Sequence, residues 1–310
     1  MSTEKDDTFR LLTGSTGSWL VKVSQSDEPR TVVDLQTAAM RFLHRAAPDV
    51  PAQRVRLTGG GLDSVAIDTA VGGTRVLRVL GFVEGTLWAG TVPNVDQLAK
   101  LGRMLARVDA ALKSFAHPAD TRALVWDLRH FREMTELLEH TSSTEHRRLA
   151  EAVFRLFETT VVPGLGQLET QVIHGDYSPY NVVVDELSDA YVTGVIDFGD
   201  TMRSAKVFDP AVALANLIGR GEQEPWRDAG AFVAGYEQVS PMVDRELAVL
   251  PVAALARLTL RALVTNWRAS RVPGRRDYVL AHAKDDWVRL QRSIAVPMDE
   301  VLSQLRTAPR

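Results

Sequence analysis

The chain has 310 residues and a formal net charge of −3, and 45% of its residues are hydrophobic. With so little net charge and no polybasic run, a nucleic acid or an anionic membrane surface is disfavoured as a partner. The absence of cysteine excludes disulfides, thiolate metal sites and a cysteine nucleophile. The polar N-terminus and the lack of a long apolar run predict neither a signal peptide nor a membrane span, so we expect a cytoplasmic protein.

Residues 1–80 have the pattern of a small antiparallel sheet with one helix. Largely alternating apolar residues over 8–24, with a glycine-bounded turn at 14–17, predict a hairpin. An apolar stripe predicts a helix over 29–46. Glycine turns then separate further strands between residues 53 and 80. Residues 1–80 are therefore predicted to form a small β lobe of their own.

The pattern changes after residue 80. Residues 81–93 carry three glycines and a proline, which predicts a hinge between two lobes. From Asn94 onward, apolar residues recur at helical spacing, and Asn94 with Gln97 resembles a capping box. The sequence therefore predicts an α+β, two-lobed fold with a helical C-terminal lobe over 94–310. Helices are expected near 94–112, 120–139, 144–161, 208–219, 226–238, 241–270 and 277–292.

One stretch from Val172 to Asp200 concentrates polar residues at fixed distances. A short strand precedes His174, Asp176 and Asn181, which form an H-x-D-x-x-x-x-N pattern. A predicted hairpin over 182–196 then leads to Asp197, which opens an Asp-Phe-Gly motif. In kinase-type phosphoryl transfer, these two elements hold the catalytic base and the metal ligands.

The residue types fit that chemistry. Asp176 can accept a hydrogen bond from an attacking hydroxyl and orient it. The amide oxygen of Asn181 and the carboxylate of Asp197 are the kind of ligands that Mg²⁺ takes from a protein, with water and phosphate oxygens completing its shell. His174 is interpreted as structural support for the loop.

A nucleotide must also be held by the small lobe. Lys22, within the strand WLVKVS, is the candidate for binding its phosphates. Asp34, on the following helix, is a candidate acidic partner for Lys22, and a solvated first-turn acid is the alternative. The backbone of Gly81 and Val83 in the hinge is the candidate contact for the base. Glu4 to Thr8 is a candidate turn over the phosphates.

Residues after the metal motif are candidates for support and for the acceptor pocket. Asp209 is expected either to cap the next helix or to brace the catalytic loop from below. Asp200 and Trp267 are candidates for the acceptor pocket. The arginines at 261, 268 and 271 would suit an acidic or ring-bearing ligand, and a solvated basic helix face is the alternative.

These motifs resemble the aminoglycoside phosphotransferase family, which shares the protein-kinase-like fold, and they are most similar to its hydroxylysine-kinase-like branch. The resemblance covers about residues 4 to 270. It implies that Asp176 is the catalytic residue, that Asn181 and Asp197 bind Mg²⁺, and that Lys22 binds the phosphates of ATP or GTP. Two positions depart from the family pattern: Ala38 stands where many members place a glutamate, and the first strand is shortened. The resemblance to the family rests on the stretches HGDYSPYNVVV, GVIDFGD, WLVKVS, DLQTAAMRFL, LRVLGFVEGT and AHPADTRALVWDL.

The sequence therefore predicts an Mg²⁺-dependent kinase that moves the γ-phosphate of a nucleoside triphosphate to a hydroxyl of a small molecule. An antibiotic or sugar-bearing metabolite is the first expected substrate class, and a hydroxylated amino acid or amine is the second. A nucleotide-binding pseudokinase and a hydrolase metal site are the alternatives. The sequence gives no indication of the oligomeric state.

Overall fold

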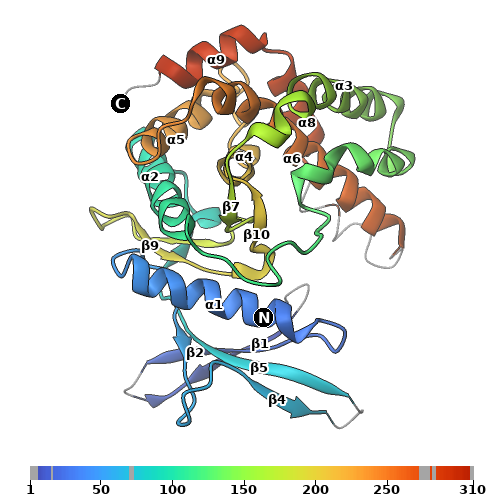
Figure 1. Ribbon diagram of the computed structural model, residues 1–310. Helices are drawn as coiled ribbons and strands as arrows, with labels where there is room; N and C mark the ends of the chain where they lie inside the picture. Colours follow the sequence, from blue (N-terminus) through green and yellow to red (C-terminus); the bar gives the residue numbers. More distant parts are fainter. Residues whose placement is uncertain (1–5, 15–16, 70–72, 272–279, 281–283, 308–310) are drawn as a thin grey trace.

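The structure is a computed structural model that describes residues 6–14, 17–69, 73–271, 280 and 284–307. A small antiparallel sheet with one helix against it forms one end of the molecule, and a mainly helical region forms the rest (Figure 1). The sheet has the order β1-β2-β5-β3, and β4 also pairs with β5. Its strands are β1 (Asp7–Leu12), β2 (Ser18–Val23), β3 (Val55–Arg56), β4 (Val65–Asp68) and β5 (Thr74–Gly81). The predicted hairpin is thus present, although Ser15 and Thr16 of its turn lie outside the described residues.

The register of this sheet places two cations side by side. Lys22 of β2 lies opposite Arg78 of β5, and the two strands are antiparallel. Directly opposite residues share a face of the sheet, so the two side chains leave the same face. Both residues are buried, at 6% and 4% exposure. That face turns toward the rest of the molecule, because α1 (Arg30–Ala46) lies between the sheet and the helical region (Figure 1).

Two sets of backbone hydrogen bonds join the sheet region to the helical region. The first follows β5: β6 (Thr86–Leu87) pairs with β8 (Val182–Val184), which pairs in turn with β9 (Val192–Val195). The second follows α1, where Ala52 forms a parallel bridge with Val195 and the Gln53 N–H donates to the Val195 carbonyl at 2.9 Å. Much of the predicted hinge over 81–93 is therefore built into the helical region through β6 and the short 3-10 helix η2 (Trp88–Gly90).

The helical region follows the predicted order with several corrections. The capping box of Asn94 and Gln97 starts α2 as expected. The expected helix over 120–139 starts only at Leu128 and is a 3-10 helix. The start of the helix predicted over 277–292 lies largely outside the described residues, and β10 and α9 were not predicted. The bounds are α2 (Val95–Leu112), η3 (Leu128–His140), α3 (Thr144–Thr160), η4 (Val162–Gln167), β7 (Thr170–Ile173), η5 (Phe198–Asp200), β10 (Met202–Ala205), α4 (Phe208–Ala215), α5 (Arg227–Glu237), α6 (Asp244–Arg271), α8 (Asp286–Ile294) and α9 (Met298–Thr307).

The helices α2 and α5 cross at backbone contact. A Cβ atom at Gly102 would lie 1.9 Å from the Phe232 carbonyl oxygen, and one at Gly235 would lie 1.9 Å from the Ala99 carbonyl oxygen. No side chain fits at that distance, so the two glycines permit the close crossing. The crossing fixes α2 within the core of the helical region.

Helix α6 is the central helix of this region. By length and composition alone it could cross a membrane, with a mean hydropathy of 1.8 in its most apolar window. However, 89% of that window is buried inside the fold, which is the environment of a core helix. The polar residues of α6 must therefore find their partners, or their role, inside the fold.

Candidate active site

The catalytic loop after β7 is held from below by one buried carboxylate. The two oxygens of Asp209 accept from the N–H groups of His174 and Gly175, at 2.8 and 2.9 Å. Gly175 has a φ of 80°, and a Cβ atom there would lie 2.3 Å from the Asp200 carbonyl oxygen, so a glycine is required. Of the two expectations for Asp209, the brace is correct and the cap is wrong, because Val207 occupies the N-cap position of α4.

His174 supports the same loop from inside. Its side chain is fully buried, and Nδ1 accepts from the Asp176 N–H at 3.3 Å while Nε2 lies 3.2 Å from the Ile196 carbonyl oxygen. The ring also packs against Phe198, with ring centroids 4.7 Å apart. These contacts tie the loop to the strand end that carries the Asp-Phe-Gly motif, as a structural residue would.

Asp176 and Asn181 lie together at the mouth of this loop. The Asn181 amide donates to Oδ2 and to the backbone oxygen of Asp176, at 2.6 and 2.9 Å. The amide nitrogen is thus engaged, which leaves the amide oxygen of Asn181 for a cation. Burial raises the pKa of Asp176, and the Arg257 guanidinium opposes that effect.

Asp197 has the charge that a metal ligand needs. Its backbone is left-handed (φ 59°, ψ 79°), and its Oδ1 accepts from the Gly199 N–H at 3.1 Å and from Lys22 Nζ at 3.2 Å. Burial alone would raise the pKa of Asp197, but the charges of Lys22 and Arg78 and the Lys22 hydrogen bond hold it below its ordinary value. The side chain remains 42% exposed, which leaves its second oxygen open to a ligand.

The donor set fits Mg²⁺ bound together with phosphates. Within the ranges that the structure describes, no group of three or more histidine, aspartate or glutamate side chains could hold a metal ion by itself. One amide and one carboxylate match a cation that completes its shell with phosphate and water oxygens. A self-contained hydrolase metal site does not have this composition.

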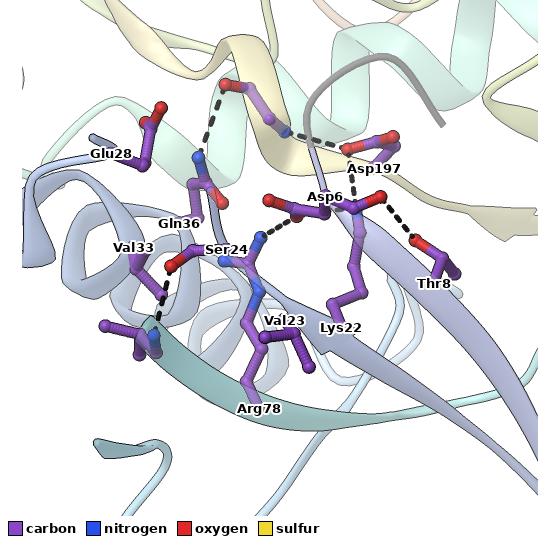
Figure 2. A network of polar contacts seen from close by, with 12 residues as sticks. Asp6, Thr8, Lys22, Val23, Ser24, Glu28, Val33, Gln36, Arg78 and Asp197 are labelled. Atoms are coloured by element: carbon purple, nitrogen blue, oxygen red, sulfur yellow. Dashed lines mark hydrogen bonds and ion pairs between the residues drawn. The ribbon is translucent and has the colours of Figure 1, made fainter. Parts of the chain in front are cut away.

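Lys22 has a different acidic partner from the expected one. Figure 2 shows Lys22 directed at Asp197, with the Asp6 carboxylate between Lys22 and Arg78. Asp6 lies 3.6 Å from Lys22 Nζ and 3.0 Å from Arg78. Asp34 was the wrong residue: it lies 3.9 Å from Arg30 one turn earlier on α1, on a more exposed face.

Two further side chains at this point were missed. Gln36 is the α1 residue that faces the site, and its amide donates to the Gly199 carbonyl at 3.4 Å (Figure 2). Arg78 adds a second buried cation beside Lys22, and its Nη1 has no hydrogen-bond partner among the described residues. The strand pairing in a predicted hairpin sheet was the signal that could have identified Arg78.

The hinge residues do not reach the cavity that these groups line. The Gly81 N–H donates to the Arg54 carbonyl at 2.7 Å, and its carbonyl accepts from the Gln53 side chain at 3.0 Å. Val83 packs against Gly194, where an added Cβ atom would lie 2.4 Å from the valine side chain. Their contact with a nucleotide base stays a prediction. Glu4 and Lys5 of the candidate phosphate turn lie outside the described residues.

The cavity has a volume of about 480 Å³ and extends from Lys22 past Asp176 to α6. Asp200 lines it as expected. Trp267 does not, because it lies beneath Arg271, at 4.6 Å from ring centroid to guanidinium carbon. Trp126, which was not among the predicted site residues, lines the cavity instead. The far wall is formed by α6, through Arg257, Arg261, Thr265 and Arg268.

Comparison with known families explains this arrangement. Residues 2–245 match the model of the phosphotransferase enzyme family. The chain belongs to this family. It is a small-molecule kinase, and its two-lobed fold is the protein-kinase-like fold that the sequence predicted.

Relatives of this phosphotransferase include kinases of amino acids. It is 26% identical to hydroxylysine kinase of Mus musculus over 88% of the chain and 76% of that protein. It is 27% identical to homoserine kinase of Rhodospirillum rubrum over 72% of the chain and 65% of that protein. Among solved structures, an aminopropanol kinase superposes with a TM-score of 0.71 at 17% identity, covering 99% of this chain and 96% of that one. An amicoumacin kinase superposes with a TM-score of 0.70 at 16% identity, covering 96% and 88%.

Two acids, Asp109 and Asp209, are buried beneath the catalytic loop of the phosphotransferase. Asp109 is fully buried and accepts from the Tyr236 hydroxyl at 2.6 Å. Burial, and then the charge of Asp209, raise the pKa of Asp109 well above its ordinary value. A carboxyl whose pKa is higher in the folded state contributes stability at low pH and loses it as the pH rises from the unfolded pKa toward the folded pKa.

We therefore expect Asp109→Asn to remove this loss of folding stability at higher pH. The amide oxygen can still accept from Tyr236, so the variant should fold. Its free energy of unfolding relative to the parent chain should improve as the pH rises from 5 to 8, by up to about 1.4 kcal/mol per pH unit. Urea unfolding at both pH values measures this difference. If the free energies of unfolding of the two proteins changed with pH in the same way, Asp109 would be ionised in the folded state.

Proposed function

We propose that this phosphotransferase moves the γ-phosphate of ATP or GTP, with Mg²⁺, to a hydroxyl group of a small polar acceptor. The observation that carries the proposal is the convergence of Lys22, Asp176, Asn181 and Asp197 on one cavity, although they come from both parts of the fold. Lys22 Nζ and Asp197 Oδ1 lie 3.2 Å apart, although the two residues are 175 positions apart in the chain.

Each residue has a distinct task in this proposal. Lys22 and Arg78 neutralise the phosphates of the nucleotide. Asn181 and Asp197 hold Mg²⁺, which supplies charge neutralisation when bound. Asp176 accepts a hydrogen bond from the acceptor hydroxyl and aligns its oxygen with the γ-phosphorus, since a loose transition state depends mainly on positioning.

Two classes of acceptor are candidates for this site. Antibiotics remain a candidate class, and the structural neighbours include kinases of amicoumacin and of aminoglycosides. Hydroxylated amino acids and amines have more support, because the sequence relatives include hydroxylysine and homoserine kinases. We give this second class precedence.

A nucleotide-consumption screen tests the function. Purified protein is incubated with Mg²⁺ and either ATP or GTP, together with hydroxylysine, homoserine, aminopropanol, kanamycin or a macrolide. We expect nucleotide consumption that depends on one acceptor and stops when Mg²⁺ is chelated. Tight binding of Mg²⁺ and nucleotide with no turnover on any acceptor would favour the pseudokinase alternative.

The Asp6 carboxylate occupies space between the two cations that would bind phosphate. We therefore expect Asp6→Asn to strengthen nucleotide binding about two- to tenfold, because it removes an anion that competes for Lys22 and Arg78. Isothermal titration with Mg²⁺–ATP and Mg²⁺–GTP measures the change. Asp7→Asn is the matched control, because Asp7 pairs with Arg75 at 2.7 Å and has a more exposed side chain. Weaker binding in Asp6→Asn would show that Asp6 supports the site.

A further inference from the structure

Helix α6 presents a row of basic residues to the acceptor side of the cavity. Arg257, Arg261, Thr265 and Arg268 follow the spacing of one helix face, and all four line the cavity that contains Asp176. Arg261 is engaged by Asp286, at 2.8 and 2.7 Å, and by Asn216. Arg257 is the one that touches the catalytic group.

Arg257 is buried without a full set of partners. It is 8% exposed, and its Nη2 lies 3.4 Å from Asp176 Oδ1, which is a long contact. Its Nη1 is buried and has no hydrogen-bond partner among the described residues. Leaving a charged donor buried and unpaired is costly, so such a group in a cavity wall indicates a ligand that completes it.

The aromatic wall fixes the direction of this guanidinium. Arg257 lies over the Trp126 ring, with its guanidinium carbon 4.4 Å from the centroid, and Arg268 lies 5.7 Å from the same centroid. A cation–π contact holds the guanidinium against the ring while its N–H groups remain donors. Two cations therefore contact Trp126 at the α6 wall of the cavity.

The adjoining surface has the same charge character. A second cavity of about 420 Å³ shares Tyr180, Asn216 and Arg261 with the first. Its lining adds four further cationic side chains and two acids: Arg220, Lys284, Arg289, Arg292, Asp285 and Asp286. The acids of the first cavity, Asp176, Asp197 and Asp200 among them, come from other elements, so a polycationic acceptor would meet like charge on the α6 side and an anionic group would be attracted to that side.

We propose that the acceptor carries a carboxylate, which binds to the guanidinium of Arg257 with support from Arg268 while the acceptor hydroxyl faces Asp176. The ligand class is a hydroxylated carboxylic acid, such as a hydroxyamino acid. A guanidinium binds a carboxylate through parallel N–H donors, and this geometry discriminates against a neutral or cationic group. The inference rests on the proposed function and names the substrate class of the same site.

Matched acceptor pairs test the inference directly. Homoserine is compared with 3-aminopropanol, and hydroxylysine with its decarboxylated diamine, because each pair differs only in the carboxylate. In whichever pair the enzyme phosphorylates faster, we expect kcat/KM for the acid to exceed kcat/KM for its decarboxylated partner by roughly 10- to 100-fold. Arg257→Gln should remove most of this preference, mainly through a higher KM for the acid. Arg271→Gln, on the same helix but outside the cavity lining, should retain it.

A binding measurement separates failure of this inference from failure of the proposed function. Thermal shifts are recorded with each acid and each matched amino alcohol, with no nucleotide present. A shift with the acid alone, lost in Arg257→Gln, supports the carboxylate site even if no transfer occurs. Should Arg257→Gln fail to fold, Arg268→Gln is expected to reduce the preference about threefold. Equal or better use of the amino alcohols, with no acid-specific shift, would overturn the inference.

Discussion

Asp176→Asn is expected to reduce phosphoryl transfer by about 10²- to 10⁴-fold, the usual contribution of a positioned acid–base group. The amide keeps the size of the side chain and one carbonyl oxygen. It lacks the negative charge, and it places N–H groups where the acceptor hydroxyl must donate. The residues proposed to bind the nucleotide are not changed, so nucleotide affinity should stay within about threefold of the parent value.

The measurement pairs a steady-state transfer rate with a nucleotide-binding titration on the same preparation. Asp189→Asn is the matched control, since Asp189 is exposed in the turn between β8 and β9. That variant should transfer phosphate at the parent rate. Undiminished transfer by Asp176→Asn would remove Asp176 from the mechanism, whereas loss of both transfer and nucleotide binding would indicate a folding defect.

Asp209→Ala is expected to produce the largest loss of stability, about 3–5 kcal/mol, with loss of activity. The substitution leaves the N–H groups of His174 and Gly175 buried without their acceptor, and each such group costs about 1–3 kcal/mol. The loop that carries Asp176 would then lose the support that fixes its position. Urea unfolding measures the free energy, and a transfer assay at low temperature measures residual activity.

A second acid in the first turn of a helix provides the control. Asp299 occupies that position in α9 and is exposed. Asp299→Ala removes the same favourable interaction with a helix dipole, which is worth about 0.3–1 kcal/mol. If Asp209→Ala were no more destabilising than Asp299→Ala, the brace would have no energetic role.

The catalytic loop was predictable because its functional residues lie in one continuous segment of the chain. Asp176 and Asn181 are held together within one turn, and the hairpin of β8 and β9 brings Asp197 back to them, whereas the support from Asp209 comes from farther along the chain. Short-range spacing therefore fixes most of this geometry. The sheet with one helix was predictable for the same reason, since alternation and glycine turns act over a few residues.

The rest of the cavity depends on packing between distant segments. Asp34 and Gln36 are two residues apart on α1, and only the orientation of that helix decides which one faces Gly199. Trp126 and Arg257 meet because α6 passes beside the segment before η3, a contact that no local pattern encodes. The 3-10 geometry of η3 was likewise not predictable from an apolar periodicity that fits an ordinary helix.

The two sets of backbone hydrogen bonds between the sheet region and the helical region end on the same hairpin. Ala52 bridges to Val195 of β9, and β6 pairs with β8, which pairs in turn with β9. Asn181 directly precedes β8 and Asp197 follows β9, so both candidate metal ligands stand at the base of this hairpin. The element that supports the sheet region therefore also supports both ligands, which couples the position of Lys22 to that of the proposed metal site.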